Sequence, residues 1–386
     1  MWRTLGIGIA LLGTHLALAG PAAASGGNIR DGRDTKSPLD VASVSYGRIG
    51  DGQIVTHTVH FYKPVRSRAF ASSRAILGFV LDTDLDGRPD RLAVVVYANR
   101  QLRTVVADSR GKILNVSAAT RPNSRSVTVK IATPFLGSTG GFRWSVLTMY
   151  KDRARCRRNC VDTAPNRTSV LFDYLPPTLD LGVPDPYNAF ATTTEFNVHV
   201  SVAEKVSGLK RWTLEQRAAG QTEWSTIASG TAIARIDVPR SGSEGATYEF
   251  RLTAVDKQGN VSSSTRLVSI PIDDANPLLA TAYAGGSWDA YLAGGNQLFQ
   301  NTAHRASGID ATFTYSFTGT YFAWLSPLGS GPVARVSVDG GLPREVTVNN
   351  NRRPFEVSGL VYGSHTIKIE PDPLRPGYQI DGIVVR

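Results

Sequence analysis

Short runs of alternating apolar and polar residues, separated by turn-forming residues, dominate this chain. Typical runs are RLAVVVYA at 91–98, SVTVKIA at 126–132, FNVHVSV at 196–202 and ATFTYSF at 311–317. Alternation with a period of two gives a β-strand one apolar face, whereas a helix needs apolar residues three and four positions apart. Clusters of Gly, Pro, Asn and Asp between the runs favour tight turns. The pattern predicts an all-β fold built from antiparallel β-sandwiches.

The first residues have the layout of a secretory signal peptide. Arg3 precedes an apolar run from Leu5 to Ala19, and small residues follow through Ala24. We therefore assign residues 1–24 to a signal peptide, cleaved after Ala19 or Ala24, and reject a buried helix because nothing amphipathic or capped surrounds the run. No second apolar stretch reaches the ~20 residues that span a bilayer. The mature chain is expected to be secreted, with cell-wall association as a further option.

Proline-rich segments divide the mature chain. At about 360 residues it is too long for one sandwich and suits two or three domains. Prolines punctuate the segments 171–188 and 270–279. The predicted domains are 25–175, 176–273 and 274–386.

Positive charge is concentrated in the first of these domains. It contains 24 Lys and Arg against 12 Asp and Glu, whereas the other two contain 9 against 11 and 8 against 9. The densest run, called the basic patch, consists of Lys151, Arg153, Arg155, Arg157 and Arg158. One interpretation is binding to an anionic wall polymer; the other is a solvated face that reflects a general preference for arginine over lysine. No aromatic residues interleave with the patch, so nucleic-acid binding is not expected.

Two cysteines lie four positions apart in the segment CRRNC. In an oxidising compartment, Cys156 and Cys160 are expected to form a disulfide that closes a small ring. A zinc site would need further His or Cys ligands, and none lies nearby in the sequence.

Four aspartates gather in the segment LDTDLDGRPDRL at 81–92. As an EF-hand loop the segment has suitable residues at its first, third, fifth, sixth and ninth positions. Ala93, however, stands where that motif needs a bidentate Glu. The flanking strand-like runs place the aspartates at the end of a hairpin. The predicted metal ligands are Asp82, Asp84, Asp86 and Asp90.

A structural calcium ion is the preferred interpretation of this loop. Closely spaced carboxylates repel one another unless a cation or arginines compensate. The alternative is a solvated acidic turn held by Arg88 and Arg91. No nucleophile or open catalytic shell accompanies the aspartates, so the metal is expected to stiffen the fold without taking part in chemistry.

The first domain resembles a known sandwich type. The segments DVASVSYG, THTVHFY, GFVLDTDLDGRPDRLAVVVY, SVTVKI and FRWSVLTMYKD, with CVDTAPN after them, are similar to DOMON-like jelly-roll modules of secreted actinobacterial proteins. The resemblance covers residues 40–175 and implies binding of sugar or another ligand without catalysis.

The second domain resembles fibronectin type III-like domains, which have immunoglobulin-like sandwiches. The strand and turn TYEFRLTAVDKQGNVS at 247–262 carries the resemblance through the residues Tyr248, Phe250, Ala254, Asp256, Gly259, Asn260 and Ser262. It implies a spacer or interaction module. Trp212, in a neighbouring strand-like run, is expected to lie in the core.

The third domain resembles the small galactose-binding-like sandwiches of secreted bacterial proteins. The segments GSWDAYLAGG, ATFTYSFTGTYFAWLSPLGSGPVARVSVDGG, FEVSGLVYGSHTIKIEP and DGIVV carry this likeness. The segment REVTVNNNRRPF lacks the acidic and aromatic stretch expected after VDG, so the fold alone does not imply a sugar site. Aromatic rings that stack on sugars and polar groups that bind hydroxyls give the ligand-binding candidates. These are Trp288, Tyr291, His304, Arg305 and Trp324, of which Trp324 also fits a core position.

Catalytic motifs are missing from the sequence. The mature chain has five histidines, and none shows metalloprotease spacing; no G-x-S-x-G elbow or phosphate-binding glycine loop is present. We therefore predict a non-catalytic, carbohydrate-binding protein that recognises extracellular polysaccharide. The alternatives are a structural or adhesive protein that contacts other surface proteins, and an accessory subunit of a secreted hydrolase.

Overall fold

The computed structural model confirms the all-β prediction. Its described residues are 26–50, 52–72, 74–137, 140–151, 160–166, 168–183, 190–191, 193–292, 298–327, 330–349, 352–374 and 377–386. Within them the chain forms antiparallel strands and short 3-10 segments, with no α-helix. No helix among these residues is long and apolar enough to cross a membrane. The predicted signal peptide lies outside the described residues.

The chain folds into two compact units. The first contains residues up to Pro176 together with the turns 206–208 and 256–261, and the second contains the remainder. The main division between these units falls at Pro176, and the predicted boundary at 175 stays a prediction. The expected boundary at 273 falls inside the second unit, which contains two sandwiches.

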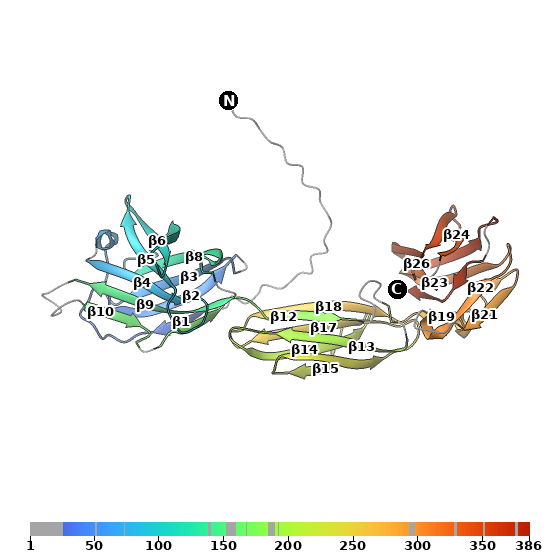
Figure 1. Ribbon diagram of the computed structural model, residues 1–386, viewed down its shortest axis with the longest axis horizontal. Coiled ribbons are helices and arrows are strands. Elements are labelled where there is room, and N and C mark those ends of the chain that lie inside the picture. The colour runs from blue at the N-terminus through green and yellow to red at the C-terminus, as the bar shows by residue number, and fades with distance from the viewer. Residues whose placement is uncertain are drawn as a thin grey trace, which may run out of the picture. The chain divides into compact units, whose positions relative to one another are not determined.

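The first unit is a sandwich of two sheets (Figure 1). One sheet has the order β1–β2–β3–β8, with the strands β1 (Gly27–Arg30), β2 (Val41–Ile49), β3 (Ile54–Phe61) and β8 (Ser126–Ala132). The other has the order β10–β9–β4–β5–β6–β7, with β11 also paired to β9. Its strands are β4 (Ala75–Asp82), β5 (Arg91–Ala98), β6 (Gln101–Asp108), β7 (Ile113–Ala118), β9 (Gly141–Tyr150), β10 (Cys160–Ala164) and β11 (Val170–Asp173).

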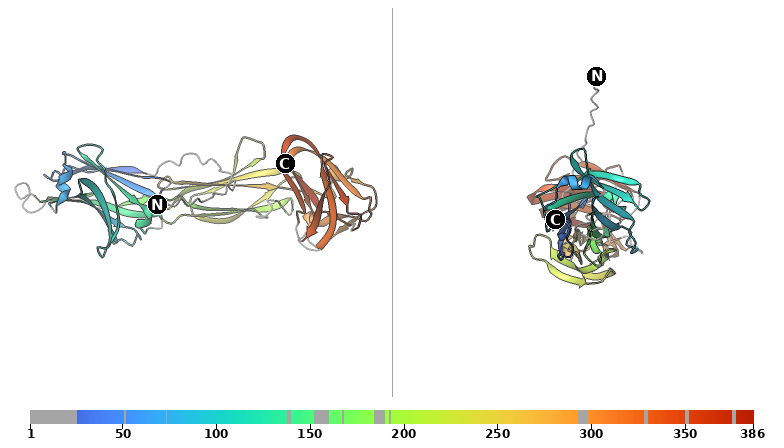
Figure 2. Two further views of the ribbon diagram at one scale, coloured as in Figure 1. Left: turned by 90° about the horizontal axis from the view of Figure 1, so that it is seen from above. Right: turned by 90° about the vertical axis from the view of Figure 1, so that its left-hand side faces the viewer.

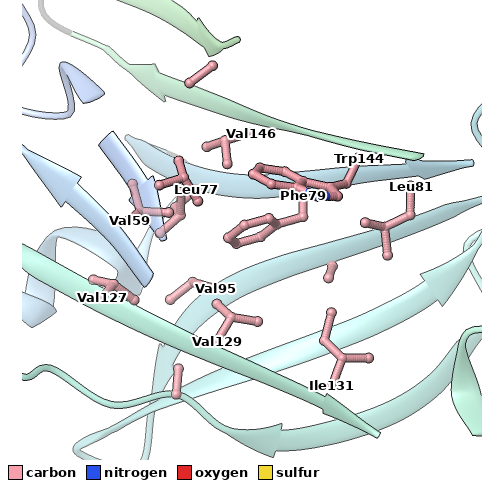
Figure 3. Packing of buried hydrophobic residues seen from close by; sticks show 14 of the residues in the cluster. Val59, Leu77, Phe79, Leu81, Val95, Val127, Val129, Ile131, Trp144 and Val146 are labelled. Carbon is pink, nitrogen blue, oxygen red and sulfur yellow. The ribbon is translucent and has the colours of Figure 1, made fainter. Parts of the chain in front are cut away.

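Alternation along the strands supplies the core of this sandwich. In β3 every second residue is buried, which turns Val55, His57 and Val59 inward. Figure 3 shows Val59, Val127 and Val129 of one sheet facing Leu77, Phe79, Trp144 and Val146 of the other. The two inner faces pack closely against each other. This packing holds the ends of the strands in place, including the ends of β4 and β5 that the aspartate loop at 82–90 connects.

The second unit begins with a smaller sandwich. One sheet has the order β12–β13–β16, with the strands β12 (Thr178–Gly182), β13 (Glu195–Ala203) and β16 (Ala234–Ser241). The other has the order β15–β14–β17–β18, with the strands β14 (Leu209–Ala218), β15 (Ser225–Gly230), β17 (Thr247–Asp256) and β18 (Val261–Ser269). Trp212 lies in the core, as expected, and its Nε1–H donates to the Ala232 carbonyl at 3.1 Å.

A larger sandwich completes the second unit, and its strands are seen from two further directions in Figure 2. The main sheet has the order β19–β28–β23–β26–β24–β25, with β20 also paired to β23. Its strands are β19 (Ile272–Asp273), β20 (Tyr283–Ala284), β23 (Thr312–Leu325), β24 (Ser330–Val338), β25 (Arg344–Asn349), β26 (Phe355–Pro371) and β28 (Gly382–Val385). The smaller sheet has the order β21–β22–β27, with the strands β21 (Trp288–Leu292), β22 (Thr302–Ala306) and β27 (Gln379–Ile380).

Candidate functional site

A cluster of aromatic and polar side chains lies where the smaller sheet of the C-terminal sandwich meets strand β20. The tyrosine ring of Tyr283 stacks on His304, with ring centroids 4.7 Å apart, and meets Trp288 edge-on at 4.8 Å. Trp288 and His304 come from neighbouring strands, where Ala290 pairs with His304 and Trp288 with Ala306. Because side chains alternate along a strand, this register places Trp288 and His304 on the same face of the sheet.

Asp274 holds the histidine in place. His304 Nδ1 donates to Asp274 Oδ2 at 2.6 Å, and the Thr302 hydroxyl donates to Asp274 Oδ1 at 2.7 Å. The Asp274 side chain is 1 % exposed, whereas that of His304 is 22 % exposed. Burial raises the pKa of Asp274, and the hydrogen bonds from Thr302 and His304 oppose that rise. The imidazole is therefore oriented by a buried carboxylate and stays partly exposed to solvent.

We call Asp274, Tyr283, Trp288, Thr302 and His304 the His304 cluster. Within the described residues His304 Nε2 has no hydrogen-bond partner, and the side chain is 22 % exposed. Trp288 is half-buried and its indole packs at the edge of the core. The cluster thus combines an aromatic surface with an oriented hydrogen-bonding group, which is the combination that sugar recognition requires.

Of the other predicted ligand-binding residues, Arg305 and Trp324 lie apart from this cluster, and the side chain of Tyr291 is outside the described part of the structure. Arg305 is exposed, and the alternation along β22 places it on the opposite face from His304. Tyr291 pairs with Ala303 along the same strands. Trp324 is fully buried, and its Nε1–H donates to the Gln379 carbonyl at 2.8 Å, so it has no ring face for a ligand. We therefore remove Trp324 from the candidate set.

Sequence reasoning missed Tyr283 and Asp274 as members of the site. Asp274 lies in the acidic pair of the segment IPIDDANPLL at 270–279, whose prolines predict a domain boundary, and no motif surrounds Tyr283. Pairing of β21 with β22, and of β20 with β23, is what brings these residues to Trp288.

An exposed aromatic residue outside the cluster was also missed. Tyr362 is 77 % exposed and Val361 is 84 % exposed, both within β26. The ring of His365 holds this segment, because one nitrogen bonds to Asp339 Oδ2 at 2.8 Å and the other to the Val361 carbonyl at 2.7 Å. His365 is therefore structural, and Tyr362 is a second surface on which a sugar could stack.

The aspartate loop of the first unit connects β4 to β5. Asp82, Asp84 and Asp86 each offer an oxygen, and these oxygens lie within 4.8 Å of one another. Asp82 is 7 % exposed, and its Oδ2 accepts from the Gly87 backbone N–H at 3.1 Å. Its Oδ1 is buried without a hydrogen-bond partner. A buried, unpaired carboxylate oxygen beside two further carboxylates fits a hard cation such as calcium.

Asp90 and the arginines have other roles in this loop. Both oxygens of Asp90 accept from Thr83, Oδ1 from the backbone N–H at 3.0 Å and Oδ2 from the hydroxyl at 2.6 Å. Arg91 contacts Asp90, at 3.7 Å, and within the described residues neither it nor Arg88 forms a salt bridge with the three clustered aspartates. Asp90 therefore braces the loop, and among the described residues Arg88 and Arg91 form no direct ion pair with Asp82, Asp84 or Asp86.

Two predicted features fall largely outside the described residues. Cys160 is buried at the start of β10, but Cys156 lies outside, so their pairing stays a prediction. Of the basic patch, Lys151 is described and exposed, and the four arginines are not.

Comparisons with known proteins give partial matches. No family model matches the chain. Over 110 residues it is 34 % identical to the A type blood N-acetyl-alpha-D-galactosamine deacetylase of Flavonifractor plautii, a match that covers 26 % of this chain and 13 % of that protein. The chain thus matches about an eighth of the length of this curated relative.

Solved structures with a similar arrangement include sugar-related and fibronectin-type proteins. An α-L-rhamnosidase from Dictyoglumus thermophilum has a TM-score of 0.30 at 10 % identity, covering 54 % of this chain and 27 % of that one. A carbohydrate-binding module of the β-sandwich superfamily has a TM-score of 0.28 at 9 % identity, covering 54 % and 98 %. The chicken CNTN1 FN1-FN3 domains have a TM-score of 0.25 at 10 % identity, covering 89 % and 97 %. At these scores, function has to be argued from the residues.

Proposed function

We propose that this chain is an exported, non-catalytic protein that binds extracellular polysaccharide through the His304 cluster. The observation that supports the proposal best is the position of Tyr283, whose ring contacts both Trp288 and the partly exposed His304. The named sugar of the partly matching deacetylase suggests glycans that carry N-acetylgalactosamine as first probes. The DOMON-like character of the first domain and its actinobacterial likeness remain predictions.

Binding would use two kinds of contact. The apolar face of a sugar ring would pack on the indole of Trp288, where burial of apolar surface and C–H contacts with the ring favour association. A sugar hydroxyl would pair with His304 Nε2, while Asp274 keeps the imidazole oriented. Preorganisation of this kind lowers the entropy cost of ordering the site on binding.

A glycan panel followed by calorimetry tests this function. We expect Trp288→Ala to weaken binding at least about tenfold, or ~1.4 kcal/mol, because the stacking surface is lost. His304→Gln should weaken binding with less effect on folding, because its side chain is partly exposed. Trp224→Ala is the matched control, since Trp224 lies in the other sandwich of this unit, between Arg217 and Arg251.

The binding results can distinguish an incorrect site from an incorrect function. Loss of binding in Tyr362→Ala alone would keep the carbohydrate-binding function and refute the His304 cluster as its site. Saturable binding to a surface protein with no glycan binding would favour the structural or adhesive alternative. Stimulation of a co-secreted hydrolase would favour the accessory role.

We also propose that the Asp82–Asp86 loop holds a structural calcium ion. The buried, unpaired Asp82 Oδ1 beside Asp84 and Asp86 supports it. We expect calcium to raise the thermal unfolding temperature of the first unit, because an ion that binds only the folded state stabilises it. Asp84→Asn should reduce the rise, whereas Asp108→Asn, at a hairpin turn elsewhere in the sandwich, should retain it in full. An equal rise in both variants would refute this site.

A further inference from the structure

A second cluster of aspartates lies at a different edge of the first sandwich. Asp31, Asp34 and Asp162 each offer a carboxylate oxygen, and these oxygens lie within 4.8 Å of one another. Asp40 interacts electrostatically with both Asp31 and Asp162. Asp31, Asp34 and Asp40 belong to the segment around the link from β1 to β2, whereas Asp162 lies in β10 of the other sheet.

Buried oxygens without partners distinguish this cluster from an ordinary acidic surface. Asp40 is 0 % exposed and Asp162 is 4 % exposed. Asp162 Oδ1, Asp40 Oδ2 and Asp31 Oδ2 are all buried with no hydrogen-bond partner. Leaving several carboxylate oxygens unpaired away from water is costly, because nothing replaces their lost hydration.

Within the part of the chain that the structure describes, Lys63 interacts electrostatically with Asp40 but forms no salt bridge with it. Among the described residues, no Lys or Arg forms a salt bridge with any of the four aspartates. Burial, followed by repulsion from the neighbouring carboxylates, raises the pKa of Asp31 to about 6. The same effects raise the pKa of Asp162 to about 7, against a hydrogen bond from Val41 that lowers it. Among the described residues, the four carboxylates therefore have no lysine or arginine in direct ion-pair contact.

The surrounding backbone fixes the carboxylates in place. The Val41 backbone N–H donates to Asp162 Oδ2 at 2.7 Å, and the Thr35 backbone N–H donates to Asp40 Oδ1 at 3.2 Å. The Tyr62 hydroxyl donates to the Asp31 carbonyl at 2.8 Å. With one oxygen of Asp162 and one of Asp40 anchored in this way, the second oxygen of each is left for another ligand.

We propose that Asp31, Asp34 and Asp162, with Asp40 beside them, form a second calcium site that links the two sheets of the first sandwich. Oxygen ligands from carboxylates are those that Ca²⁺ prefers, and a divalent cation would offset part of the negative charge of the four aspartates. The ion would fasten the segment 31–40 to β10. Its position is independent of the Asp82–Asp86 loop and of the His304 cluster.

Calcium stoichiometry tests the proposal on the full mature chain. Protein treated with EGTA is titrated with CaCl₂ in a calorimeter, with the variants Asp162→Asn, Asp84→Asn and Asp180→Asn in parallel. We expect Asp162→Asn to bind one Ca²⁺ fewer than wild type, while keeping an acceptor for the Val41 N–H. Asp180→Asn, an exposed change in the second unit, should leave the number unchanged.

Other variants keep the test decisive if Asp162→Asn does not fold. Asp34→Asn changes an exposed residue and should also remove one Ca²⁺. Terbium is a luminescent calcium substitute, and Tyr62→Phe should dim its emission without changing the calcium number, because Tyr62 is bonded to Asp31. Unchanged stoichiometry in folded Asp162→Asn or Asp34→Asn would overturn the proposal. Loss of a calcium in Asp84→Asn alone would support only the loop site.

Discussion

Burial decides which roles the aromatic and polar residues of this chain can have. Trp324 and Trp288 both lie in strands of the C-terminal sandwich, yet Trp324 is fully buried and Trp288 is half-buried. The same distinction separates His57, which is completely buried, from His304, which is partly open to solvent. Residue type alone therefore does not identify a binding residue.

His57 is an unusual core residue. Its ring lies between aromatic side chains, with Trp144 at 4.6 Å and Phe79 at 5.1 Å between ring centroids, and neither ring nitrogen has a hydrogen-bond partner. Burial lowers its pKa to about 3 from the ordinary value of 6.5. The folded chain therefore keeps this histidine neutral at neutral pH.

This burial predicts an acid-sensitive stability. Between pH 6.5 and about 3 the unfolded chain binds a proton that folded His57 rejects, so the contribution is fully present above pH 6.5 and is lost as pH falls. We expect His57→Phe to lose less stability than wild type between pH 7 and pH 4, by several kcal/mol. Denaturant unfolding at both pH values measures the difference. His60→Gln, on the opposite face of β3, is the control, and equal losses in wild type and His57→Phe would contradict the prediction.

A close backbone contact in strand β23 leaves no room for a side chain at Gly319. Gly319 and Gly363 face each other in the register of β23 and β26, next to a bulge before Tyr321. A Cβ atom on Gly319 would collide with the backbone carbonyl oxygen of Arg386, whereas a Cβ on Gly363 would have ordinary contacts, the nearest at 3.7 Å. The Arg386 carbonyl also accepts from the Thr320 backbone N–H at 2.6 Å, which ties the end of the chain to this bulge.

The two glycines therefore make a matched pair for mutagenesis. We expect Gly319→Ala to destabilise the C-terminal sandwich by about 1–3 kcal/mol, because the backbone must shift to relieve the overlap. Gly363→Ala should be neutral or slightly stabilising, because alanine restricts the unfolded chain more than glycine does. Thermal unfolding of the two variants compares them directly. Equal destabilisation would show that the collision is not the cause.

Charge is distributed unevenly over the molecule as a whole. The net charge of +10 arises from the first domain, while the other two are close to neutral. An anionic polymer that binds this domain would release counterions from its charged groups. Polymer binding at the first domain and glycan binding at the His304 cluster would then be separate properties of one chain.

Salt dependence tests the role of the basic patch. We expect retention on an anionic wall polymer to weaken steeply as salt increases, since exposed charges are screened within about 8 Å at physiological ionic strength. Glutamine replacement of the four arginines of the patch should reduce both retention and its salt dependence. The matched control replaces four exposed basic residues of the second unit, Lys210, Arg211, Arg235 and Arg266. Retention that does not change with salt would refute an electrostatic attachment.

Local patterns in the sequence determined the strand content and one acidic site. Alternation along segments such as 126–132 predicts β-strands because side chains of a strand alternate between its faces. The aspartates at 82, 84 and 86 could be recognised because neighbours in a short loop stay close in any fold. Prolines at 171–188 likewise predict a boundary from local sequence alone, because proline favours turns and linkers in any fold.

Tertiary structure alone decided the sites made from distant residues. Asp162 joins Asp31 and Asp34 across more than a hundred residues because β10 lies against the segment that precedes β2. Asp274 and Tyr283 reach His304 only through the pairing of strands and the meeting of two sheets. Composition and local spacing do not predict which distant residues come into contact, because strand register and sheet packing depend on the whole core and not on any one segment.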